Sequence, residues 1–144
     1  AYEDQMLAAI TEARARWNID GDRIALTGLS QGGHGTWVIG ARNPGLFSCL
    51  VPVCGYGSVE EVAPRVARLP VWAFHGLRDD VVDPRETLAI MQEVRRLRGS
   101  TGGDPDDARL TLYPVAGHNS WDAAYAEPDL AAWLLSRVRA DAGP

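Results

Sequence analysis

The chain has 144 residues, 46% of them hydrophobic, and a formal net charge of −5 at pH 7. Its length is that of one domain with a core of useful size, and a negative charge without a basic cluster excludes a nucleic-acid-binding surface. All 14 basic residues are arginine, which excludes lysine Schiff-base chemistry and a phosphate loop of the Gly-Lys type. No apolar run is long enough to cross a membrane, so we expect neither membrane nor nucleic acid as partners.

The predicted elements are, in chain order, a helix over 3–17, a strand over 23–27, a helix that Pro44 ends at Asn43, a strand over 49–53, a partly helical connection over 55–69, a strand over 71–75, a helix over 84–98, a polar surface loop over 99–107, a strand over 110–113 and a helix over 130–138. Strands that alternate with helices predict a single α/β domain over residues 1–144, a three-layer sandwich with a parallel sheet of about four strands. Right-handed crossovers then bring the carboxyl ends of all strands to one edge, where ligand sites gather.

The sequence shows no signal peptide, which favours a cytoplasmic location. Because it begins with Ala1 and not with Met, the removal of a leader or of a longer amino-terminal portion stays open. Cys49 and Cys54 would lie about 16 Å apart on opposite faces of one extended segment, too far for a disulfide. Neither has a partner at metal-ligand spacing, so we expect two buried thiols and no metal.

Gly28-Leu29-Ser30-Gln31-Gly32 is a Gly-x-Ser-x-Gly pentapeptide between an apolar strand and the glycine-rich start of a helix. Alone, such a match is weak, because glycine and serine are common in loops. Its context is that of a nucleophile elbow, the strained strand-to-helix turn that exposes a serine Oγ above a parallel sheet. A serine nucleophile also needs a histidine base and a carboxylate that orients this base.

Three histidines are available as the base. His34 follows Ser30 by one helical turn and lies behind it, and His75 ends a predicted strand, where it is better placed to support the next loop. His118 lies in the loop after the fourth strand and is free to reach Ser30. The loop after the third strand carries the possible acids Asp79, Asp80 and Asp83.

Three separate segments resemble the esterase and predicted-peptidase branch of the α/β-hydrolases, near the dienelactone-hydrolase-like and feruloyl-esterase-like groups. They are residues 18–37 around the pentapeptide, Phe74-His75-Gly76 with Asp79, and His118-Asn119-Ser120-Trp121. The order serine, aspartate, histidine is also that of these enzymes. The resemblance implies Ser30 as nucleophile, His118 as base and Asp79 as acid, with Asp80 and Asp83 as alternatives for the acid.

The remaining parts of such a site follow from the same resemblance. The backbone N–H of Gln31 would donate to the oxyanion, and Leu29 and Trp121 are candidate substrate-binding residues. In the family, a second donor comes from a loop after an earlier strand, and the earlier strands lie outside this sequence. The strand over 23–27 would then have an open edge, which predicts a homo-oligomer paired through this edge or a piece of a longer protein.

Together these features predict a serine hydrolase, a carboxylesterase that cleaves small to medium soluble esters through an acyl-enzyme and needs no cofactor. The connection over 55–69 is too short for a large lid, so the site should be open. Peptidase and lactone-hydrolase activities stay open because the same triad serves them. A non-catalytic hydrolase module that acts in assembly is the alternative of another class.

Overall fold

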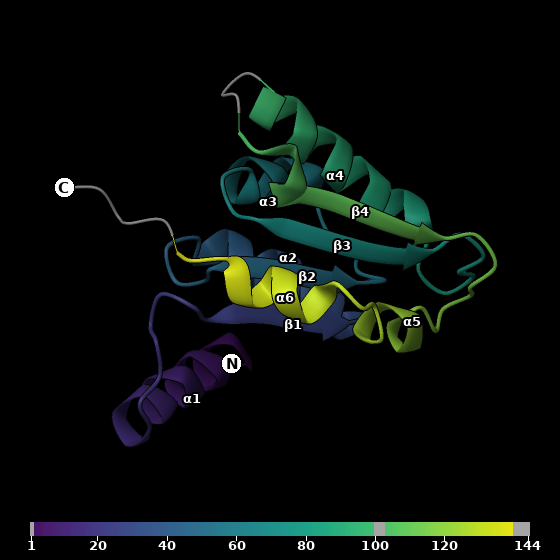
Figure 1. The fold of residues 1–144 in the computed structure, drawn as a ribbon. Helices are drawn as coiled ribbons and strands as arrows, with labels where there is room; N and C mark the ends of the chain where they lie inside the picture. Colours follow the sequence, from purple (N-terminus) through teal and green to yellow (C-terminus); the bar gives the residue numbers. More distant parts are fainter. Residues whose placement is uncertain (1, 100–102, 140–144) are drawn as a thin grey trace.

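Four parallel strands form the central sheet of this computed structural model, which describes residues 2–99 and 103–139 (Figure 1). They lie side by side in chain order and are β1 (Ala25–Leu29), β2 (Cys49–Val53), β3 (Val71–Gly76) and β4 (Ala108–Tyr113). The predicted α/β fold with a parallel sheet is confirmed. The first strand is shifted by two residues from the predicted range: it starts at Ala25 instead of Arg23, and it continues to Leu29 because Gly28 and Leu29 pair with Pro52 and Val53 of β2.

The helices are α1 (Tyr2–Arg16), α2 (Gln31–Arg42), α3 (Val59–Val66), α4 (Pro84–Gly99), α5 (Trp121–Tyr125) and α6 (Leu130–Ser136). The sequence analysis missed α5, since five residues are too few to show a helical period. Within the loop predicted over 99–107, Pro105–Asp107 forms a 3₁₀ turn, and residues 100–102 lie outside the described part. Among the described helices, none combines the length and the apolar character that a bilayer crossing requires.

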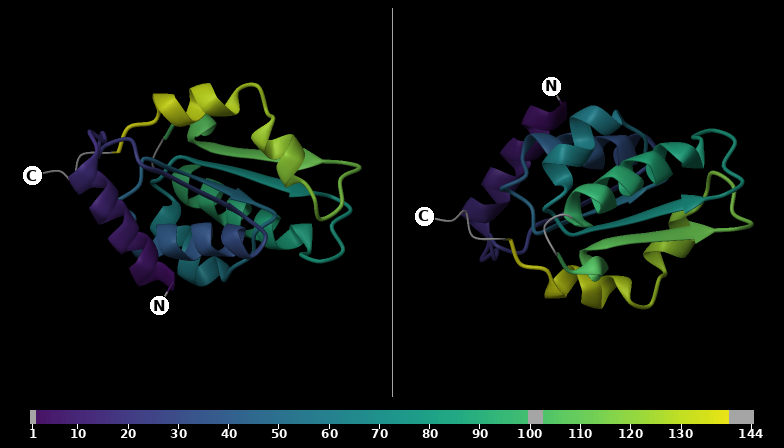
Figure 2. Two further views of the ribbon diagram at one scale, coloured as in Figure 1. Left: turned by 90° about the horizontal axis from the view of Figure 1, so that it is seen from below. Right: turned by 90° about the horizontal axis from the view of Figure 1, so that it is seen from above.

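Helices cover both faces of the sheet (Figure 2). One face packs against α2, α3 and α4 and contributes Leu50 and Ala73 to that core. The other face packs against α5 and α6, where Trp72 lies between Phe74 and Trp133 and contacts both rings. Every residue of β2 and β3 is buried, as parallel strands covered on both faces require.

The strand β1 lies at one edge of the sheet. Its residues alternate between exposed and half-buried, and Leu29 keeps 37% of its surface exposed. Among the described residues, β1 has a neighbouring strand on the β2 side alone. The helix α1 is fixed nearby through Glu3, whose carboxylate accepts hydrogen bonds from Arg42 at 2.8 Å and from Asn43 at 3.0 Å.

Candidate active site

Ser30 occupies a strained turn between β1 and α2. Its backbone has φ 55° and ψ −115°, and a positive φ is uncommon for a residue with a side chain. Two contacts hold the turn: the Ser30 N–H donates to the Val53 carbonyl oxygen at 2.9 Å, and Gly28 lies directly against Gly32. A Cβ added to Gly28 would come within 2.3 Å of the Gly32 carbonyl oxygen, so this position requires glycine. The pentapeptide therefore has the geometry expected of a nucleophile elbow.

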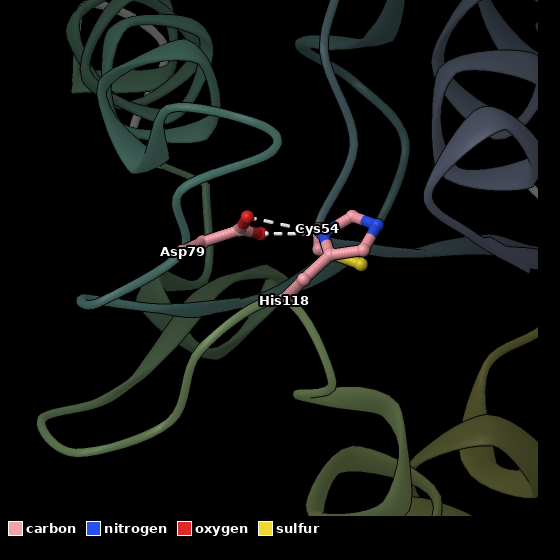
Figure 3. A group of neighbouring side chains, drawn as sticks. All are labelled: Cys54, Asp79 and His118. Carbon is pink, nitrogen blue, oxygen red and sulfur yellow. Dashed lines mark hydrogen bonds and ion pairs between the residues drawn. The ribbon is translucent and has the colours of Figure 1, made fainter.

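A chain of hydrogen bonds connects Ser30, His118 and Asp79. The Ser30 Oγ lies 2.9 Å from His118 Nε2, and His118 Nδ1 lies 2.9 Å from Oδ2 and 3.0 Å from Oδ1 of Asp79. Figure 3 shows the Asp79 carboxylate directed at the His118 ring. Because an ionised carboxylate only accepts, His118 Nδ1 carries the proton and Nε2 is left to accept from the serine hydroxyl.

The structure brings one of the three candidate aspartates to His118. The Asp79 side chain is fully buried beneath the loop after β3. Asp80 is exposed, and Asp83 forms an ion pair with Arg85. Asp79 is therefore the aspartate that can orient the His118 ring.

Hydrogen bonds keep the buried Asp79 ionised. Burial by itself would raise the pKa of this carboxyl group, but the hydrogen bond from His118 and those from the Val82 and Val81 N–H groups outweigh it. Both N–H groups donate to Oδ1 at 2.9 Å. The pKa of Asp79 therefore lies below its usual value, and the group carries its negative charge at neutral pH.

His75 stabilises the loop after β3 that carries Asp79. It is completely buried, and its Nε2 lies 3.0 Å from the Val82 carbonyl oxygen and 3.2 Å from Asp79 Oδ2. Both neighbours are acceptors, so this nitrogen carries a proton. On its other side, His75 Nδ1 lies 2.8 Å from Thr87 Oγ1 on α4. His75 thus ties the acid loop to the helix that follows it, as its position at the strand end predicts.

A cavity of about 440 Å³ opens beside Ser30. It lies between the loop after β2 and the loop that leads from β3 into α4, and its lining residues are Ser30, Gln31, Tyr56, Val81, Val82, Asp83 and Glu86.

The predicted substrate-binding residues lie elsewhere. Trp121 stands edge-on against the His118 ring, with the centroids 5.5 Å apart, and Leu29 is partly exposed at the end of β1. Neither residue is part of the cavity lining. The sequence pointed to Asp83 only as a candidate acid and did not single out the cavity residues Tyr56, Val81, Val82 and Glu86. All of them follow the carboxyl ends of β2 and β3, where a parallel sheet places its sites.

Gln31 is the first residue of α2. Its backbone N–H follows Ser30 directly, and the amino-terminal end of a helix carries a partial positive charge. This amide therefore suits a negatively charged oxygen at the cavity mouth. It is the donor that the sequence analysis expects there.

Cys54 lies behind the His118 ring (Figure 3). Its Sγ, a ring nitrogen of His118 and a carboxylate oxygen of Asp79 lie within 4.8 Å of one another, a set that could surround a metal ion. The other two residues are already hydrogen-bonded to each other, however, and burial raises the pKa of the Cys54 thiol, with smaller effects from its neighbours. The thiol is thus neutral. The three side chains therefore fit a hydrogen-bonded arrangement better than a metal centre.

The two cysteines do not lie on opposite faces, contrary to the expectation from the sequence. Cys54 comes one residue after β2 ends and has φ 41°, so the alternation of the strand stops before it. Both thiols are free, and both belong to the core under α5 and α6.

Several solved structures with the same fold are named as esterases or peptidases. A thermostable esterase superimposes with a TM-score of 0.84 at 30% identity, over 94% of this chain and 36% of its own. Esterase PE8 does so with 0.70 at 22% identity, over 88% and 57%, and an acylaminoacyl peptidase with 0.65 at 17% identity, over 81% and 23%.

This chain spans between about a quarter and three fifths of these proteins. No protein-family model matches its sequence. The chain has the α/β-hydrolase fold that these proteins share.

Proposed function

We propose that Ser30, His118 and Asp79 are the catalytic triad of a serine hydrolase that cleaves carboxylic esters. The observation that carries this proposal is the continuous chain of hydrogen bonds from the Ser30 Oγ through His118 to a buried carboxylate. The strained backbone at Ser30 supports it, since such strain clusters at functional sites. The likeness to the thermostable esterase at 30% identity supports hydrolysis as the reaction class.

In this mechanism, His118 Nε2 takes the hydroxyl proton as the Ser30 Oγ attacks the ester carbonyl carbon. The carbonyl oxygen gains the electron pair of its π bond and faces the Gln31 N–H. The C–O bond to the leaving group then breaks, and His118 gives its proton to the departing alkoxide. Water, deprotonated by the same nitrogen, later attacks the carbonyl carbon of the acyl-enzyme. The bond between this carbon and the Ser30 Oγ then breaks, His118 returns the proton to Ser30, and the acid leaves. Asp79 fixes the tautomer of His118 and stabilises the imidazolium.

Esters are the substrate class of this proposal, although the same triad can cleave amides and lactones. The cavity beside Ser30 is open to solvent on the described part of the chain, and no long segment between β2 and β3 covers it. An open site suits soluble esters of small to medium size. The acylaminoacyl peptidase is 17% identical, a likeness that supports the fold alone.

The test combines active-site labelling with turnover. A fluorophosphonate probe should label the folded protein at Ser30, and p-nitrophenyl acetate should be hydrolysed. Ser30→Ala should lose both, while Ser48→Ala should keep both, because Ser48 is a buried serine at the opposite end of the neighbouring strand. Circular dichroism would establish that each variant is folded. A folded protein that the probe does not label, or that it labels equally in Ser30→Ala, would refute the proposal.

A further inference from the structure

We propose that the cavity beside Ser30 is the acyl-binding pocket of the enzyme, and that it selects uncharged acyl groups of moderate length. This inference rests on the proposed function, because it assigns the two halves of an ester to two sides of Ser30. Two residues set the substrate class: Tyr56 limits the length of the acyl group, and Glu86 disfavours an acyl group with a negative charge.

The assignment of the two sides follows from where the protons move. The leaving group must face His118, because His118 Nε2 gives it a proton. His118 and the Trp121 ring packed on it lie outside the cavity lining, whereas Ser30 and Gln31 both belong to it. A carbonyl carbon bound to Ser30 Oγ with its oxygen toward the Gln31 N–H therefore directs the acyl chain into the cavity and the alcohol toward His118.

Two valines form an apolar wall that the triad itself holds in place. Val81 and Val82 both line the cavity, and their N–H groups donate to Asp79 Oδ1 at 2.9 Å. The hydrogen bonds that stabilise the ionised acid thus also fix this wall. A volume of about 440 Å³ is many times the roughly 30 Å³ that one water occupies in the liquid, so the cavity has room for an acyl chain of several carbons.

Tyr56 limits the length of this chain. Its ring stacks on the ring of His34 with the centroids 4.4 Å apart and the planes 10° from parallel. Its carbonyl oxygen also lies 2.9 Å from His34 Nδ1. Because two contacts hold Tyr56 against His34 on α2, Tyr56 is a fixed boundary of the cavity. The role of His34, which is not part of the triad, is to hold Tyr56 in place.

The charge preference comes from the side of the cavity next to α4. Asp83 and Glu86 both line the cavity there. Arg85 holds Asp83 in an ion pair, and its hydrogen bonds lower the pKa of Asp83 to about 2. Since Arg85 offsets Asp83, Glu86 supplies the net negative charge of the wall. An acyl group that carries its own carboxylate would meet this charge and be disfavoured.

The experiment keeps the p-nitrophenol leaving group constant and varies the acyl group. Wild-type protein should prefer the butyrate ester to the hemisuccinate ester, which has a similar length and a terminal carboxylate. Glu86→Gln should raise the kcat/KM ratio of hemisuccinate to butyrate by about threefold to tenfold, and the gain should shrink in high salt. Glu93→Gln is the matched control, because it makes the same substitution on the same helix, about two turns further along and outside the lining.

Length is tested with Tyr56. Tyr56→Ala should shift the preferred acyl chain by at least two carbons toward longer esters, and Tyr56→Leu, which keeps more of the packing, should shift it less. If either folded variant keeps the wild-type preference, or if Glu86→Gln leaves the ratio unchanged, the pocket assignment is wrong. Fluorophosphonate labelling separates the two failures: labelled protein with an unchanged preference overturns this inference alone, whereas unlabelled wild-type protein overturns the proposed function.

Discussion

Replacing Asp79 by asparagine changes one atom of a buried side chain, and the structure specifies which hydrogen bonds fail. Oδ1 accepts from the N–H groups of Val81 and Val82, which can only donate. The amide oxygen of asparagine must therefore take the place of Oδ1. Its NH₂ group then takes the place of Oδ2, which faces His118 Nδ1 at 2.9 Å and His75 Nε2 at 3.2 Å.

The NH₂ group would then face two further donors, His118 Nδ1 and His75 Nε2. His118 can relieve its part of the conflict by giving up its Nδ1 proton and carrying the proton on Nε2 instead. That nitrogen could no longer accept the hydroxyl proton of Ser30. We expect kcat/KM of Asp79→Asn to fall on the order of 10⁴-fold, the size of effect that a wrong histidine tautomer has in a serine protease triad. The unmatched donors in a buried site should also cost about 1–3 kcal/mol of the free energy of unfolding.

Asp80→Asn is the matched control, because Asp80 is the exposed neighbour in the same loop. Hydrolysis of p-nitrophenyl butyrate measures kcat/KM, urea unfolding measures stability, and ¹⁵N NMR of His118 reports the tautomer. Asp80→Asn should match wild type in all three. A folded Asp79→Asn variant that keeps more than about a tenth of the wild-type kcat/KM would contradict this role of Asp79, as would an Asp80→Asn variant that loses as much activity as Asp79→Asn.

Three further predictions concern the packing and the ionisation of the site. Gly28→Ala should destabilise the protein by about 1–3 kcal/mol in urea unfolding, because the new Cβ meets a backbone carbonyl oxygen, whereas Gly45→Ala, which has open space around it, should not. Folding lowers the pKa of Asp79, so its contribution to stability is complete well above the usual value of 3.8 and is lost as pH falls through the lower folded value. The stability difference between wild type and Asp79→Asn should therefore shrink as pH falls below about 4, and a constant difference would contradict this. Burial raises the pKa of Cys49 to about 11 and also raises that of Cys54, so iodoacetamide at about pH 8 should modify neither thiol until urea is added.

The sequence predicted the alternation of strands and helices because each buried strand is a short, uninterrupted apolar run. It also predicted which residues come together at the candidate site. Ser30, Asp79 and His118 each follow a different strand, and a parallel sheet brings such positions to one edge. The choice among three neighbouring aspartates stayed open, because it depends on which side chain the backbone of the loop turns inward.

The residues that line the cavity could not be predicted from the sequence, for a related reason. Nothing in the pattern around Tyr56 sets it apart from any exposed loop tyrosine until α2 brings His34 against its ring. Trp121 was predicted to bind substrate because it is large and lies close to His118 in the sequence. The structure places it against the His118 ring, since α5 begins at this residue and follows the histidine loop closely.

The hydrogen bond between Ser30 and His118 joins residues 88 positions apart, and their strands, β1 and β4, are the two opposite edges of the sheet. It can form only after all four strands have found their neighbours, and contacts so distant in sequence are slow to form during folding. Reactivity at Ser30 would thus appear as one of the last events of refolding. A pulse of an active-site reagent at successive times would count the molecules whose sheet is complete, which makes the serine a kinetic reporter of its own fold.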